Sequence, residues 1–183
     1  MITLTTKDIL SLLQKNELEP TRLENEVVAR LREKKLKVAT AESCTGGLIS
    51  ERITRVSGAS AVFDCGVCSY ANEIKEKLLG VQHDTLSILG AVSAETAIQM
   101  AEGVKKLSGA DITVSVTGIA GPTGGTAEKP VGLVFLGICS EIDAYAVKLL
   151  LGENGNRDFI RAMASTAALF MVLEETHKYI EIT

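Results

Sequence analysis

Short, apolar, β-prone segments that alternate with helical segments are the feature that most limits the fold of this chain. Strands are predicted over residues 36–41, 61–70, 111–117, 131–139 and 143–150. Helices are predicted, from the helical spacing of apolar side chains, over residues 6–15, 20–34, 48–56, 72–79, 93–107 and 156–175. The last two strands lie close enough together to form a hairpin. The pattern predicts an α/β fold in which helices pack on a sheet with at least one antiparallel pair.

The length of the chain suits one domain with a short extension. The chain has 183 residues, against ~150 for a typical domain. We expect a helical N-terminal arm over residues 1–20 and one main domain over residues 21–183, because no linker-like stretch divides the rest. Apolar residues make up 46% of the chain and charged residues 23%, which excludes disordered and collagen-like proteins.

Charge and aromatic content exclude several classes of partner. The net charge is −4, from 19 basic and 23 acidic residues, so we do not expect a dedicated nucleic-acid-binding protein. Four Phe, three Tyr and no Trp are too few for an RNA-stacking surface. The longest apolar run covers residues 167–173, whereas a membrane-spanning helix needs about 20 residues. The N-terminus shows no secretory signal, so we expect a cytoplasmic protein without membrane contact and with reduced cysteines.

Residues 42–47 (ESCTGG) follow a predicted strand and precede a predicted helix. Ligands of open α/β sheets bind beyond the carboxyl ends of the strands, and the free N–H groups of a helix N-terminus favour anions. The two glycines allow a ligand to approach the backbone closely, and Ser43, Cys44 and Thr45 supply candidate nucleophiles or phosphate ligands. The alternative is an ordinary strand-to-helix turn with a Ser or Thr cap.

A nucleophilic Ser43 would need a base, and histidine is scarce. His83 and His177 form no cluster, so the sequence does not support a Ser-His-Asp arrangement. A lysine can act as the base when burial lowers its pKa. If strands 36–41 and 61–70 are neighbours, Lys75 lies one turn into a helix beside Ser43. The alternative is a solvent-exposed lysine on a helix surface.

Two further segments are candidates for binding an anionic ligand. Residues 118–130 form a Gly- and Pro-rich loop that matches neither a Walker P-loop nor a dinucleotide-binding pattern. Loops of this length in small domains are often functional, and the alternative is a mobile surface loop. Arg157 stands at the start of the last predicted helix, where it could hold an anion beside free N–H groups. Otherwise it is an exposed arginine.

Cys65 and Cys68 form a CxxC pair inside an apolar predicted strand. Redox-active pairs usually lie at a helix start, which lowers a thiol pKa, and a zinc site would need two more ligands at suitable spacing. Cys44 and Cys139 are distant in the sequence. We therefore expect Cys65 and Cys68 to be buried structural thiols that point to opposite faces of the strand, and we expect no bound metal.

Six motifs follow one another along the chain: AESCTGG at 41–47, YANEIK at 70–75, LGV at 79–81, GAVSAET at 90–96, TGIAGPTGG at 117–125 and KPVG at 129–132. Together they resemble the CinA C-terminal family, over about residues 24–174. Characterised members of that family are nicotinamide mononucleotide deamidases. The resemblance implies a three-layer α/β/α sandwich with a mixed sheet. It also implies hydrolysis of the nicotinamide amide to nicotinic acid mononucleotide and ammonia, a step of pyridine-nucleotide (NAD) salvage that needs no cofactor.

The resemblance also assigns roles to residues. The family's catalytic Ser/Lys pair matches Ser43 and Lys75, and Tyr70 matches a tyrosine that assists the pair. Arg157 matches the arginine of a Gly-Asp-Arg motif, although this chain reads Gly155-Asn156-Arg157 and lacks the acid. The residues expected to bind substrate are Cys44, Thr45, Gly46, Gly47, Asn72, Thr117, Gly118, Gly121 and Arg157.

Two alternatives to the amidase stay open at this point. A non-catalytic nucleotide-binding module of the same family would use the same pocket without turnover, and a thiol enzyme would use Cys44 in place of Ser43. In each case the expected ligand is a small-molecule nucleotide. We also expect the chain to form homo-oligomers, with a dimer before other states.

Overall fold

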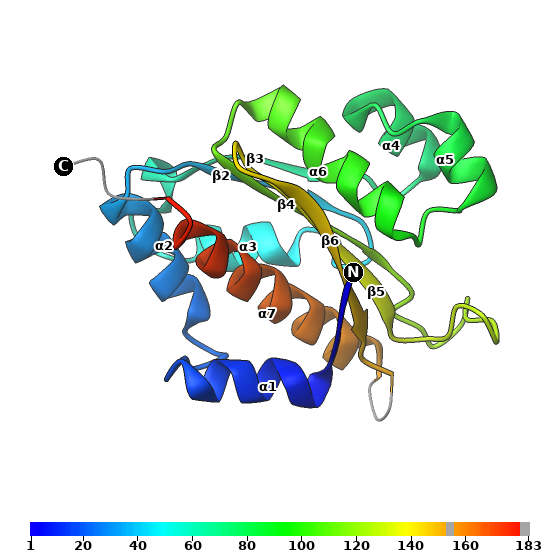
Figure 1. Ribbon diagram of the computed structural model, residues 1–183, viewed down its shortest axis with the longest axis horizontal. Coiled ribbons are helices and arrows are strands. Elements are labelled where there is room, and N and C mark those ends of the chain that lie inside the picture. The colour runs from blue at the N-terminus through cyan, green and yellow to red at the C-terminus, as the bar shows by residue number, and fades with distance from the viewer. Residues whose placement is uncertain (153–155, 180–183) are drawn as a thin grey trace.

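The computed structural model of the chain describes residues 1–152 and 156–179 (Figure 1). The strands are β1 (Ile2–Thr5), β2 (Val38–Glu42), β3 (Phe63–Cys68), β4 (Ile112–Gly118), β5 (Leu133–Cys139) and β6 (Ala144–Leu150). The α-helices are α1 (Thr6–Lys15), α2 (Leu23–Glu33), α3 (Leu48–Thr54), α4 (Asn72–Leu79), α5 (His83–Ile88), α6 (Ala94–Ser108) and α7 (Arg157–Thr176). A 3-10 turn covers Ala59–Ala61.

The six strands form one mixed sheet in the order β1-β6-β5-β4-β2-β3. β2 runs parallel to both β3 and β4, β5 runs antiparallel to β4 and β6, and β1 runs parallel to β6. Glu42, at the end of β2, pairs with Cys68 of β3 and with Val116 of β4. The carboxyl ends of these three parallel strands therefore meet at one edge of the sheet, which is where open α/β sheets bind ligands.

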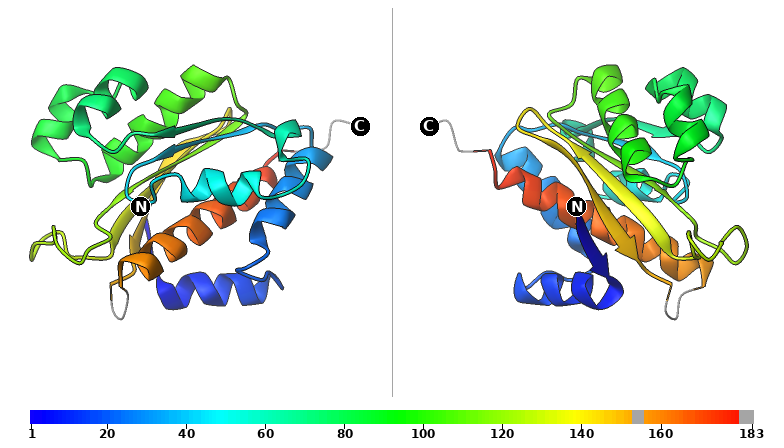
Figure 2. Two further views of the ribbon diagram at one scale, coloured as in Figure 1. Left: turned by 180° about the vertical axis from the view of Figure 1, so that it is seen from behind. Right: turned by 45° about the vertical axis from the view of Figure 1, so that its right-hand side comes forward.

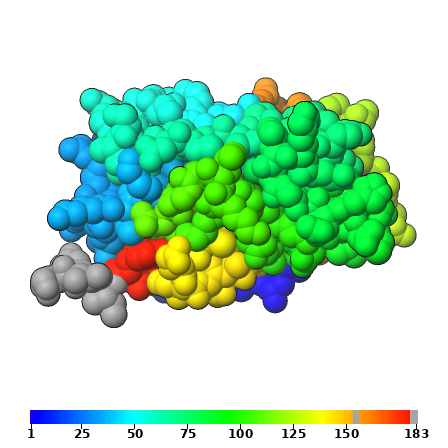
Figure 3. All heavy atoms as spheres, turned by 90° about the horizontal axis from the view of Figure 1, so that it is seen from above, coloured from blue at the N-terminus to red at the C-terminus, as the bar shows by residue number. Residues whose placement is uncertain are grey.

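Helices cover both faces of the sheet, and this confirms the predicted three-layer α/β/α sandwich. α4, α5 and α6 lie on one face, while α2, α3 and α7 lie on the other, with α1 beyond α7 (Figures 1 and 2). Seen from above, the segments around α4–α6 cover most of the first face (Figure 3). β5 is buried along its whole length, as expected for a strand covered on both sides. No helix among residues 1–152 and 156–179 is long and apolar enough to cross a membrane.

The structure differs from the sequence-based expectation at the N-terminus. A helical arm was expected over residues 1–20, but residues 2–5 form the strand β1, in which Ile2 pairs with Val147 of β6. The helical part begins at Thr6. Its start is fixed by a capping box, in which the Thr5 side chain accepts from the Asp8 N–H and the Asp8 carboxylate accepts from the Thr5 N–H.

Candidate active site

Ser43 and Lys75 meet at the carboxyl edge of the sheet. Ser43 directly follows β2, and Lys75 lies in the first turn of α4, which follows β3. Because β2 and β3 are paired neighbours, the condition for bringing the two side chains together is met. Lys75 Nζ lies 3.1 Å from Ser43 Oγ. The alternative of a solvent-exposed Lys75 is wrong, since only 1% of the residue is exposed.

The surroundings of Lys75 favour its neutral form. Nζ lies 2.8 Å from the carbonyl oxygen of Ser69 and 3.3 Å from that of Tyr70. No carboxylate among residues 1–152 and 156–179 lies within 4.0 Å of it. Burial therefore lowers the pKa of Lys75, and the weaker opposing influence of Cys44, Cys68 and Glu73 does not reverse this. A neutral amine has two N–H donors for the two carbonyls and one lone pair that can accept the Ser43 proton.

A cavity of about 350 Å³ opens over this pair. This volume is within the range of ~300–1,000 Å³ that is usual for small-molecule sites. Five segments form its wall: the elbow, which is the turn of residues 43–47 between β2 and α3, the start of α4, the turn before α6, the loop after β4 and the start of α7. The lining residues are Ser43, Cys44, Tyr70, Asn72, Lys75, Ala91, Val92, Thr117, Gly118, Ile119, Ala120, Gly121, Thr123, Gly124 and Arg157.

The structure brings most of the residues predicted to bind substrate to this cavity, but not the second half of the elbow. Thr45, Gly46 and Gly47 are absent from its lining. The N–H of Gly46 donates to the Ser43 carbonyl at 3.1 Å, and the N–H of Gly47 donates to Glu42 Oε2 at 3.0 Å. The helix N-terminus that the sequence offered to an anion is thus occupied by a carboxylate of the protein. For Cys44 and Thr45, no acceptor of the backbone N–H occurs in the described part of the chain.

Arg157 joins two walls of the cavity. Its Nη1 donates to the Gly121 carbonyl at 2.8 Å, and its Nη2 donates to the Tyr70 hydroxyl at 3.1 Å. α7 begins at Arg157, and Asn156 caps it by accepting the Phe159 N–H at 2.9 Å. Asn156, which replaces the acid of the family motif, therefore has a capping role. Gly155 lies outside the described residues.

Side-chain hydrogen bonds connect the end of β4 and the loop after it to the turn before α6. Thr117 Oγ1 donates to the Ala91 carbonyl at 2.7 Å, while Lys129 Nζ donates to the carbonyls of Leu89 and Val92 at 2.6 and 2.9 Å. These contacts hold the two segments together as one wall of the cavity. Sequence reasoning assigned no role to Lys129, for which the KPVG motif was the only signal.

Cys44, the cysteine that lines the cavity, lacks the features of a reactive thiol. Cys44 is buried, and burial raises the pKa of its thiol to about 12. Cys65 and Cys68 point to opposite faces of β3, as predicted, but Cys65 is half-buried and Cys68 is exposed, so the expectation that both are buried is wrong. β3 is an edge strand, and Cys68 at its end is therefore accessible to solvent. In the part of the chain that the structure describes, no three His, Cys, Asp or Glu side chains are grouped as metal ligands.

Replacement of Cys65 and Cys68 together by alanine is expected to leave turnover within about threefold of the wild type, because substitutions away from a site change free energies by about 0.5 kcal/mol. The purified wild-type protein and the double variant should both be free of stoichiometric zinc by elemental analysis. Zinc that is present in the wild type and lost in the variant would contradict this.

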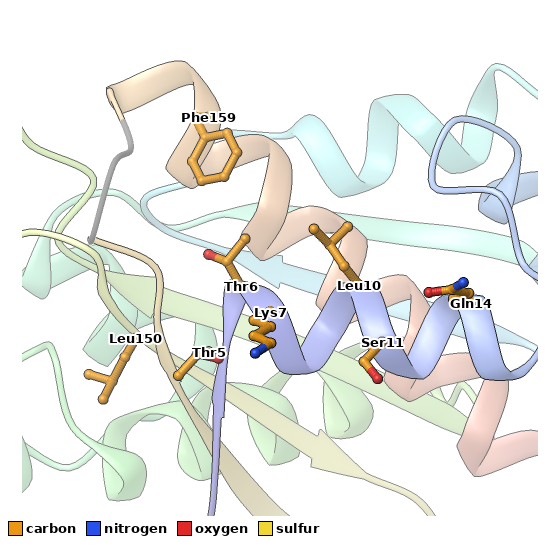
Figure 4. A pocket seen from close by; sticks show the side chains of 8 residues that line it. All are labelled: Thr5, Thr6, Lys7, Leu10, Ser11, Gln14, Leu150 and Phe159. Atoms are coloured by element: carbon orange, nitrogen blue, oxygen red, sulfur yellow. The ribbon is translucent and has the colours of Figure 1, made fainter.

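A second cavity, of about 520 Å³, lies between α1 and the start of α7 (Figure 4). The residues that line it are Thr5, Thr6, Lys7, Leu10, Ser11, Gln14, Leu150 and Phe159. Lys7 is the one ionisable side chain in that lining, and it has no nucleophile–base contact. This cavity is larger than the one over Ser43 but lacks the arrangement that covalent chemistry requires.

Comparison with known proteins gives clear relatives. Residues 20–176 match the model of the CinA C-terminal domain. The chain is 54% identical over 150 residues to a CinA-like protein of Kosmotoga olearia, which covers 82% of this chain and 36% of that protein. It is 46% identical over 160 residues to a CinA-like protein of Thermotoga maritima, which covers 87% and 38%. The chain thus spans little more than a third of the length of these curated relatives.

Solved structures with the same fold span the domain itself. The competence/damage inducible protein CihA from Agrobacterium tumefaciens superposes with a TM-score of 0.82 at 42% identity, over 85% of this chain and 94% of that one. A competence-damaged protein (CinA) superfamily protein from Klebsiella pneumoniae superposes with a TM-score of 0.83 at 28% identity, over 88% and 99%.

Proposed function

The chain belongs to the CinA C-terminal domain family, and on this basis we propose that it hydrolyses the carboxamide of nicotinamide mononucleotide, which gives nicotinic acid mononucleotide and ammonia. The observation that carries the proposal is the contact of 3.1 Å between Ser43 Oγ and a buried Lys75 Nζ that has no counter-ion in the described residues. A serine with an adjacent neutral amine is an activated nucleophile. The amide carbon is the electrophile that such a pair attacks.

The first half of the reaction makes an acyl-enzyme. Ser43 Oγ bonds to the carboxamide carbon as its proton moves to Lys75 Nζ. The C–N bond then breaks, and the proton on Lys75 passes to the leaving nitrogen, so that ammonia departs and Lys75 is neutral again. The two carbonyls of Ser69 and Tyr70 hold the amine in place by accepting its other N–H groups.

The second half of the reaction returns the enzyme to its starting state. Lys75 takes a proton from water, the hydroxide attacks the acyl carbon, and the ester bond to Ser43 breaks as its oxygen regains a proton. In both halves a tetrahedral oxyanion develops. The N–H group of Cys44, which lines the cavity and has no acceptor in the described part of the protein, is the candidate for its hydrogen-bond donor.

Each of the two alternative functions differs from the amidase in one observable. A thiol enzyme needs a thiolate at Cys44, and burial, which raises the pKa of that thiol to about 12, opposes its formation. A nucleotide-binding module would bind nicotinamide mononucleotide without converting it. The test is to incubate the purified protein with nicotinamide mononucleotide and to quantify ammonia and nicotinic acid mononucleotide. The proposal requires equal amounts of both, whereas saturable binding without product would favour the binding module.

Arg157→Ala is expected to lower kcat/KM for nicotinamide mononucleotide by roughly 10- to 150-fold, mainly through KM, because a charge-assisted hydrogen bond is worth ~1.5–3 kcal/mol. We assign the phosphate to Arg157 because its guanidinium is exposed at the cavity. Steady-state kinetics with the mononucleotide and with the dephosphorylated riboside measure the effect.

The riboside separates phosphate recognition from a general disturbance of the cavity. The riboside should be a poor substrate for the wild type, and Arg157→Ala should change kcat/KM for the riboside little. Arg30→Ala is the matched control, since Arg30 is a partly exposed arginine on α2 that is not part of the cavity. Equal losses on the two substrates would show that Arg157 does not bind the phosphate.

A further inference from the structure

Glu42, the residue directly before Ser43, is an enclosed carboxylate. It is 1% exposed. Its Oε2 accepts the N–H groups of Gly47 and Ile49, each at 3.0 Å. Its Oε1 accepts the N–H of Ser50 at 2.8 Å and the hydroxyl of Ser50 at 2.7 Å. No Lys, Arg or His nitrogen in residues 1–152 and 156–179 lies within 4.0 Å of it.

A buried carboxylate without a counter-ion is unfavourable unless hydrogen bonds replace its hydration. Here four donors do so, and three of them are N–H groups at the start of α3, where the helix dipole also favours a negative charge. Helices are usually capped by a Ser, Thr or Asp side chain at the N-cap position itself, and such a residue would cap α3 without help from Glu42 in the preceding strand. Gly47 at that position makes no side-chain bond. The carboxylate therefore does more than cap: it ties the end of β2 to the start of α3 across the turn between them.

That turn carries the nucleophile. The Ser43 N–H donates to the Val116 carbonyl at 2.9 Å, and the Ser43 carbonyl accepts the Gly46 N–H at 3.1 Å. Gly46 and Gly47 both have positive φ, 61° and 95°, which reverses the chain so that the Gly47 N–H reaches back to Glu42. The backbone of Ser43 is thus held on both sides, and the bond from Gly47 to Glu42 closes the turn.

We propose that Glu42 is a positioning residue for the nucleophile. Its carboxylate engages the N–H groups of Gly47, Ile49 and Ser50, which fixes the turn so that Ser43 Oγ faces Lys75. In the turn held in this way, the N–H group of Cys44 has no acceptor in the described residues and lies at the cavity, where an oxyanion would form. Glu42 is not among the residues that line the cavity, so it acts through Ser43 rather than on the substrate. The inference rests on the proposed function.

Glu42→Gln tests this, because the amide keeps the shape of the side chain while its nitrogen cannot accept an N–H. We expect kcat for ammonia release from nicotinamide mononucleotide to fall by ~10- to 100-fold, since a misplacement of about 1 Å can cost 10²-fold in rate. KM should stay within about threefold, because the residues that contact substrate are unchanged. Glu51→Gln is the matched control: it makes the same change at an exposed glutamate of α3 whose side chain pairs with Arg55 and not with the turn, so kcat should stay within about threefold.

A second variant changes the conformation of the same turn and leaves the Glu42 side chain intact. Gly47→Ala adds a methyl group that meets nothing within 4 Å, at a φ of 95° that strains any side chain. It too should lower kcat by ~10-fold or more with KM retained. Circular dichroism and urea unfolding establish which variants are folded under the assay conditions, and Gly47→Ala decides the result if Glu42→Gln is not folded.

The outcomes separate this inference from the proposed function. A wild-type protein that releases no ammonia contradicts the function itself. A wild type that is active, with a folded Glu42→Gln that keeps kcat within about threefold, overturns the positioning role. A loss confined to KM also overturns it, because Glu42 would then act on binding. A loss of stability with unchanged kcat would leave Glu42 a purely structural cap and contradict the proposal.

Discussion

Ser43→Ala and Lys75→Ala are each expected to lower kcat for amide hydrolysis by ~10³-fold or more, and the double variant should be hardly worse than either single one, because residues that act as a unit have non-additive effects. The reason is the contact of 3.1 Å between Ser43 Oγ and Lys75 Nζ. Without Lys75 no base takes the serine proton, and without Ser43 the amine has no nucleophile to activate. Steady-state ammonia release by the four proteins measures the effect.

Variants of matched shape exclude a loss of folding as the cause. Lys75→Met keeps the buried aliphatic chain and removes the base, and Lys75→Arg should be inactive because a guanidinium keeps its proton. Lys77→Ala is the control on the same helix, since Lys77 is exposed. More than about a tenth of wild-type kcat in a folded Lys75→Met would remove lysine from the base role.

The pH dependence of the wild type follows from the same contact. Burial holds the pKa of Lys75 below its ordinary value, so the neutral amine forms at a lower pH than for an exposed lysine. The protonated form is inactive, and activity should therefore rise with pH through the pKa of Lys75 and level off above it. Lys77→Ala should leave this profile unchanged.

The second large effect concerns stability and lies away from the cavity. Arg52 of α3 and Glu24 of α2 form a buried ion pair, with Nη2 2.6 Å from Oε2. The guanidinium also donates to the hydroxyls of Ser165 and Thr166 of α7 at 3.0 and 2.9 Å, and to the Pro20 carbonyl at 2.8 Å. Arg52 thus connects the three helices that pack on one face of the sheet, and α7 among them carries Arg157.

Arg52→Ala is expected to lower the free energy of unfolding by about 3–5 kcal/mol, because it removes the contact of 2.6 Å and leaves the buried Glu24 carboxylate with the more distant Arg55 Nη1, 3.9 Å from Oε1. Urea unfolding should show a lower midpoint with an unchanged m-value. Arg30→Ala is the matched control, since Arg30 pairs with Glu33 at the solvent-facing side of α2, at 3.5 Å, and such pairs are worth about 0–1 kcal/mol. Equal losses in the two variants would show that the buried pair contributes no more than a surface pair.

The sequence predicts the elements that its local pattern encodes. The strands and longer helices were placed to within a few residues because apolar periodicity marks them. β1 was missed because Ile2–Thr5 is a strand only by pairing with β6, about 145 residues away in the chain. α5, His83–Ile88, was missed because six residues are too few to show a helical period. These elements are set by tertiary contacts rather than by local preference.

The candidate site was predictable to the extent that it follows strand ends. Ser43 and Lys75 follow two strands that the sequence already suggested as neighbours, so their meeting could be anticipated. The burial of Lys75 could not, because the spacing of Lys75 in its helix also suits an exposed lysine. The sequence also could not predict that Glu42 accepts the N–H groups at the start of α3, because these bonds depend on the reversal of the chain at Gly46 and Gly47. Because these N–H groups already bind Glu42, the N-terminus of α3 is not available to the phosphate of a ligand, contrary to what the sequence had suggested.

Ammonia release from nicotinamide mononucleotide, measured side by side for the wild type, Ser43→Ala and Cys44→Ala, tests the central claim most directly. We expect the wild type to release ammonia, Ser43→Ala to lose ~10³-fold or more in kcat, and Cys44→Ala to stay within about tenfold, since it retains both members of the pair. An inactive wild type would contradict the amidase, and an active Ser43→Ala beside an inactive Cys44→Ala would move the nucleophile to the thiol.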